Sequence, residues 1–197
     1  MLKKLGVLKR EYTWESTYQL FMVCAFPIHV WAILMAFSDF SWVADRTRLW
    51  DAVGLVSYAL IFALIETVGV FVIVWLLGLL IPARWEVNRR VALLGSLFLV
   101  IAVWAMLSQL YFMLNKPLPP QVVDSLAGAE HPLRVMWGVT FPVLVLSVVV
   151  PAFAIIRSDR TRDIVAGIFE RISVLSTFYV CVDLIGILIV LIRSVTV

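Results

Sequence analysis

The chain has 197 residues, of which 63% are hydrophobic and 15% charged, and its formal net charge is +3. A soluble domain of this length needs a charged shell around its core, and this composition does not supply one. Water-soluble folds are therefore excluded, and the sequence indicates an all-α integral membrane protein that uses lipid as its solvent.

Five apolar stretches are long enough to cross a bilayer core about 30 Å thick, which requires roughly 20 helical residues. We expect each stretch to be a helix, because the hydrocarbon core cannot satisfy open backbone groups and strand-like alternation is absent. The five helices predict a single transmembrane domain over residues 1–197. In chain order the predicted spans are 18–37, 52–81, 91–114, 136–156 and 172–192.

The segments outside the spans are short. The basic segment 1–16 is interpreted as a solvated flank or as a short amphipathic helix. The loop at 115–133 predicts about one turn of helix from Gln121 to Leu126. Residues 157–171 place apolar side chains on one face, which predicts a helix that lies on the membrane surface before the fifth span, or a face that docks on a partner.

Basic residues are distributed unevenly between two sets of segments. Eleven Lys and Arg residues precede span one or lie between spans two and three and between spans four and five. Five lie in the remaining connections and after span five. Because cytoplasmic segments carry the excess of Lys and Arg, this bias predicts a cytoplasmic N-terminus and an external C-terminus. The short loops and the charge bias suit a cell membrane, of the bacterial inner-membrane type.

Four polar side chains interrupt the spans at a similar predicted depth: His29, Glu66, Gln109 and Asp183. At a rise of 1.5 Å per residue they fall within about 10 Å of one another along the membrane normal. A charge near the bilayer centre costs roughly 2.5–3.5 kcal/mol even on the lenient insertion scale, so such groups face protein. Small residues flank them at helical spacing, which favours close helix packing. The sequence therefore predicts an intramembrane polar cluster.

Three interpretations of this cluster stay open. It holds the bundle together by hydrogen bonds, it contacts another subunit, or it relays protons or ions through Glu66, Asp183 and His29. A relay needs polar groups that reach both surfaces, and the inner halves of the spans offer few. The serines there are Ser96, Ser147 and Ser173.

No catalytic residue and no metal site is predicted. The chain has no GxxxxGK[ST], HExxH or GxSxG motif. His29 is a candidate axial ligand for a haem or pigment, but the second histidine, His131, falls on an external loop, so bis-histidine haem within this chain is excluded. No cofactor is required, no basic tract suggests nucleic acid, and the isolated Cys24 and Cys181 predict no disulfide.

These observations favour a non-catalytic accessory or structural subunit of a larger membrane protein complex, with the lipid bilayer and other membrane subunits as partners. The first alternative is a small proton- or ion-coupled transporter or channel that uses Glu66, Asp183 and His29. The second is the membrane domain of a lipid-linked transferase whose catalytic head is elsewhere.

Overall fold

The computed structural model describes residues 13–38, 45–82, 84–113 and 117–196, so most of the basic segment 1–16 lies outside the described residues. Within those ranges the chain is helical and contains no strand. The elements are α1 (Trp14–Ser38), α3 (Leu49–Gly78), α4 (Val87–Ser108), the π-helical turn η3 (Gln109–Met113), α5 (Pro120–Ala127), α6 (Pro132–Arg157) and α7 (Asp159–Thr196).

Five of these helices are long and apolar enough to cross a membrane: α1, α3, α4 with the start of η3, α6 and α7. They coincide with the five predicted spans, and the chain is a multi-pass membrane protein of the all-α class. The short helix expected from Gln121 to Leu126 is present as α5.

The helix expected over 157–171 begins at Asp159 and is one element with the fifth span, so no break marks where a surface helix would end and the span begin. Ser158 has an extended backbone and ends α6. Its Oγ accepts a hydrogen bond from the backbone N–H of Thr161 at 3.2 Å, as an N-cap serine does, and α7 starts there. No proline follows in α7, so the helix continues unbroken from Asp159 to Thr196.

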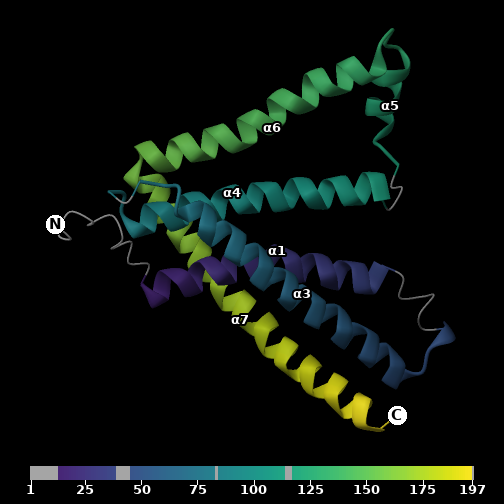
Figure 1. Ribbon diagram of the computed structural model, residues 1–197. Coiled ribbons are helices and arrows are strands. Elements are labelled where there is room, and N and C mark those ends of the chain that lie inside the picture. The colour runs from purple at the N-terminus through teal and green to yellow at the C-terminus, as the bar shows by residue number, and fades with distance from the viewer. Residues whose placement is uncertain (1–12, 39–44, 83, 114–116, 197) are drawn as a thin grey trace.

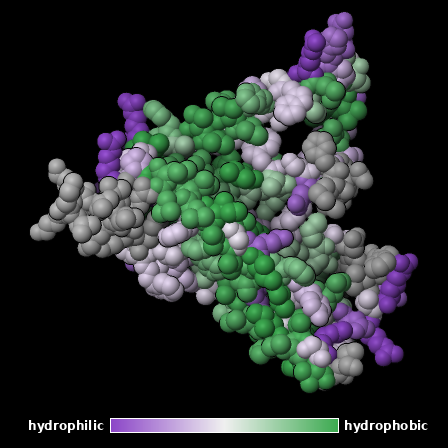
Figure 2. Space-filling model, in the orientation of Figure 1, coloured by the Kyte–Doolittle hydropathy of each residue, from purple (hydrophilic) through white to green (hydrophobic). Residues whose placement is uncertain are grey.

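The spanning helices meet at one end of the bundle and diverge toward the other (Figure 1). We call the meeting end the base: it holds the start of α1, the end of α3, the start of α4 and the α6–α7 junction. The opposite end is the rim. Figure 2 shows hydrophobic side chains along much of the helices and hydrophilic ones gathered toward their ends, as a bilayer requires.

Helix α1 is the centre of the bundle and α6 is at its edge. Helix α1 packs along α3, α4 and α7, whereas α6 packs mainly against α4. In α1, 39% of the most apolar stretch is buried inside the protein, whereas in α6 only 6% of the corresponding stretch is buried. The Trp104 indole N–H on α4 reaches across to Ser147 Oγ on α6 at 3.0 Å.

The apolar core occupies the base half of the bundle. Its buried side chains are Leu20, Val23, Cys24, Val74, Val91, Leu94 and Phe169. Helix α4 approaches α7 closely here, because Gly95 leaves room for the Phe169 ring. A Cβ added at Gly95 would lie 2.5 Å from that ring and 3.2 Å from Val23 Cγ1.

Ion pairs fasten α7 near both of its ends. At the base, Arg162 Nη1 lies 2.9 Å from Glu86 Oε2, just before α4. At the rim, Arg193 Nη2 lies 2.9 Å from Asp51 Oδ1 on α3. Exposed pairs of this kind contribute little stability, so they orient α7 rather than hold it. The position of α7 is therefore stabilised mainly by packing between the helices.

We predict that Gly95→Ala destabilises the protein by about 1–3 kcal/mol, because the methyl group overpacks a site closed by the 2% exposed Phe169. Gly69→Ala is the matched control, since a Cβ at Gly69 meets nothing within 4 Å. That control should be neutral or slightly stabilising. Unfolding in mixed micelles at rising SDS measures both, and equal stabilities of the two variants would contradict the packing described here.

Candidate functional site

A histidine on α1 and an aspartate on α7 are paired in the interior of the bundle. His29 Nε2 lies 2.9 Å from Asp183 Oδ2, and both side chains are 0% exposed. His29 Nδ1 lies 2.8 Å from the backbone oxygen of Ala25, one turn earlier on α1. The imidazole lies parallel to the Tyr179 ring, with 5.8 Å between ring centroids. The histidine is thus fixed on three sides.

The geometry determines how many protons the pair holds. A carbonyl oxygen only accepts hydrogen bonds, so His29 Nδ1 must carry a proton and donate it to Ala25. The contact between Nε2 and Asp183 Oδ2 then needs one more proton, on either atom. The pair is an imidazolium with a carboxylate, or a neutral imidazole with a carboxylic acid. Both forms have zero net charge, which lowers the cost of burial in the membrane.

Asp183 belongs to a stripe of small and polar side chains on α7. The buried members are Ser173, Ser176, Asp183 and Gly186, spaced so that one helical face carries all four. Ser173 Oγ, Ser176 Oγ and Asp183 Oδ1 are buried without a hydrogen-bond partner. Such atoms in native proteins are commonly satisfied by internal water. The sequence placed Ser176 and Gly186 beside Asp183 as small residues at helical spacing, and the structure buries both on the face that carries Asp183.

Two hollows lie along α7, one on the rim side and one on the base side of the His29–Asp183 pair. The rim hollow, about 500 Å³, is lined among others by Ser57, Leu60, Val182 and Gly186. The base hollow, about 450 Å³, is lined among others by Ser16, Gln19, Glu170 and Ser173. Val182 and Gly186 place the rim hollow within one turn of Asp183, whereas Ser173 is ten residues, or about 15 Å, away along the axis.

The four predicted polar residues do not form one cluster. The structure brings His29 and Asp183 together, but it leaves Glu66 and Gln109 in a separate groove between α3 and α4. The residue after Glu66 on α3, Thr67, is buried, and its hydroxyl donates to Ala63 O at 2.7 Å. Because each helical residue turns by about 100°, Glu66 points away from the face that carries Thr67, and its side chain is exposed.

The pair geometry argues against His29 as an axial ligand. A ligating imidazole needs a free nitrogen lone pair and room for a flat ring, and both nitrogens of His29 are engaged in a fully buried site.

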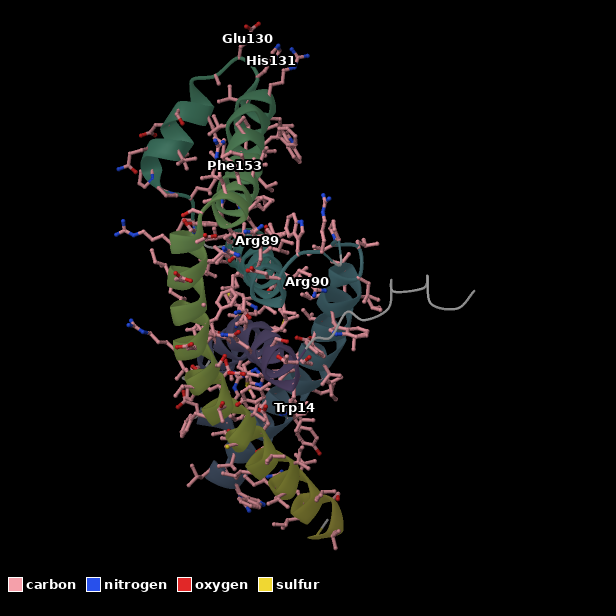
Figure 3. The ribbon with its side chains drawn as sticks, turned by 90° about the vertical axis from the view of Figure 1, so that its left-hand side faces the viewer. Trp14, Arg89, Arg90, Glu130, His131 and Phe153 are labelled. Atoms are coloured by element: carbon pink, nitrogen blue, oxygen red, sulfur yellow. The ribbon has the colours of Figure 1, made fainter. Side chains whose placement is uncertain are left out.

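His131 lies with Glu130 at the tip of the α5–α6 connection, whereas Arg89 and Arg90 lie at the base (Figure 3). In the described part of the chain, no three His, Cys, Asp or Glu side chains gather as a metal site would require.

Compared with protein-family models, with curated proteins and with solved structures, the chain has no significant match. The class is therefore defined by the fold and the site alone. The chain is a multi-pass α-helical membrane protein with a neutral histidine–aspartate pair buried between its first and last spans.

We predict a strongly non-additive double-mutant cycle at this pair. His29→Phe or Asp183→Leu alone leaves one buried polar partner unsatisfied and should cost about 1–3 kcal/mol. The double variant removes both groups and should cost clearly less than the sum. Asp183→Asn is the conservative control, because its amide still donates to a neutral His29. SDS unfolding of the four variants measures this, and additive losses would show that the two residues do not interact.

Proposed function

We propose that the chain is a non-catalytic subunit of a larger membrane assembly. The observation that carries the proposal is the position of α6, a membrane-spanning helix with 6% of its most apolar stretch buried. In lipid, helices associate through close packing and polar contacts rather than through the hydrophobic effect. A helix held at an angle to its neighbour leaves a wedge, and a helix from another chain fits that wedge.

The polar interior supports a structural role for this chain. The His29–Asp183 pair joins the first and last spans, and Tyr18 Oη lies 2.7 Å from Thr177 Oγ1 between the same two helices. Interhelical polar contacts of this kind contribute about 0.6 kcal/mol each on average. Together they join α1 to α7.

The proposed orientation puts the base in the cytoplasm and the rim outside. Among the described residues, Arg84, Arg89, Arg90, Arg157, Arg160 and Arg162 all belong to base segments. This excess agrees with the positive-inside rule, with the N-terminus in and the C-terminus out. The charge bias and short connections support a bacterial inner membrane as the location.

The subunit role predicts co-purification. Extracted from its native membrane in a mild detergent, the 22.3 kDa chain should migrate as a larger complex that contains at least one different membrane protein. The same chain produced alone in an unrelated host is the control and should lack this partner. Native mass spectrometry of both samples is the measurement. A stable lone monomer from native membranes would contradict the proposed subunit role.

A second candidate, proton-coupled transport, is favoured by one specific observation. The His29–Asp183 pair holds one shared proton and lies between the base and rim hollows, and its second carboxyl oxygen, Asp183 Oδ1, has no hydrogen-bond partner. An intramembrane ionisable pair in such a position suits proton loading and release. Glu66 lies in a different groove, so this path would use the pair alone.

This second candidate predicts a sharp difference between two conservative variants. Reconstituted in liposomes with an imposed pH gradient, Asp183→Asn should reduce proton flux at least about tenfold, because an amide cannot bind and release a proton. Glu66→Gln should keep the wild-type flux. A pH-sensitive dye inside the liposomes reports both. Wild-type flux in Asp183→Asn, or no flux above empty liposomes in the unaltered protein, would remove transport as a function.

A further inference from the structure

Glu66 lies at the depth of the acyl chains with an exposed carboxyl group. It follows the first residue of α3 by 17 positions and precedes the last by 12, which places it about 25 Å and 18 Å from the two helix ends. Both distances exceed half of a hydrocarbon core about 30 Å thick. No ion pair or hydrogen bond of its side chain is present within the described residues. A charged carboxylate is costly at this depth, and such groups in membrane proteins typically pair with a partner or face protein.

The surroundings of Glu66 are a groove rather than a flat surface. The α3–α4 groove has a volume of about 380 Å³, and residues of α1 form its third side. Its lining is apolar apart from two groups, Glu66 and Gln109. Ala59, Ala63, Ala102 and Ala105 line it as well, and such small residues let a helix backbone approach closely. Since backbone groups in lipid must be satisfied internally, an occupant from another protein is itself a helix.

The charge of the occupant follows from what this chain lacks. None of the five apolar spans contains a Lys or Arg, and their single histidine, His29, is buried against Asp183. A second copy of this chain therefore has no cation to place opposite Glu66 at this depth. A complementary charge must come from a different protein.

Building on the proposed subunit role, we propose that the α3–α4 groove binds a transmembrane helix of a different membrane protein, which places a cationic side chain against Glu66. Gln109 offers a second polar contact along the same groove. Glu66 and the cationic side chain of the other protein neutralise each other, and each of these charges would be costly in lipid without the other. This gives the contact both its register along the membrane normal and its selectivity.

Three synthetic transmembrane peptides test this proposal with the purified full chain in zwitterionic phosphatidylcholine vesicles. The peptides share one polyleucine sequence and differ only at the central residue, which is Leu, Gln or Lys. We expect the Lys peptide to bind at least about tenfold more tightly than the Leu peptide, measured by energy transfer between labelled peptide and protein. Glu66→Gln should abolish that difference, whereas Glu130→Gln, on an exposed loop, should preserve it.

A photo-crosslinking residue at groove position Ile101 should capture the Lys peptide, and one at Val149 on α6 should not. Equal binding of the Lys and Leu peptides, a preference that survives Glu66→Gln, or crosslinks between two copies of this chain at Ile101 would each overturn the proposal. In native membranes, a complex whose crosslinks fall on α6 alone would overturn the groove but leave the subunit role. A lone monomer in native membranes would contradict both the groove proposal and the subunit role.

Discussion

The contact between His29 and Asp183 is the constraint on which the arrangement of this bundle depends. It joins helices whose residues are 154 positions apart, at a depth where neither group can be left without a partner. The requirement for one shared proton makes the pair neutral, so burial adds no net charge to the interior. Close to this point α3 also approaches α7, where Gly186 lies against the backbone of Ser57.

The two halves of the bundle are held by different physics. The base half has a dense apolar core, including the Gly95–Phe169 contact, and resembles the interior of a soluble protein. The rim half packs through small residues such as Gly186 of α7, which lies against Ser57 of α3, and the helices diverge there (Figure 1). Divergent helices expose grooves and wedges at membrane depth. This geometry suits a protein that receives helices from other chains, and it also puts the rim hollow within one turn of the ionisable pair.

The sequence was enough to predict the five spans, because their length and hydrophobicity are set by bilayer thickness. Counting along the helices also predicted that His29 and Asp183 lie at a similar level, and their contact confirms it. The sequence could not predict rotation about each helix axis. Glu66 is next to Thr67, yet the first faces a groove and the second faces the interior. The continuity of α7 from Asp159 into the fifth span could not be predicted either, because an amphipathic segment followed by an apolar one looks the same whether or not the helix breaks between them. The orientation of the termini stays a prediction.

The most direct test of the central contact is solid-state NMR of the full chain in lipid bilayers, with ¹⁵N-labelled histidine and ¹³C-labelled aspartate. We predict a protonated Nδ1 on His29 and a measurable dipolar coupling between Nε2 and the Asp183 carboxyl carbon. Glu66→Gln should leave this coupling unchanged, and Asp183→Leu should abolish it. An unprotonated Nδ1 with no coupling to Asp183 would contradict the account.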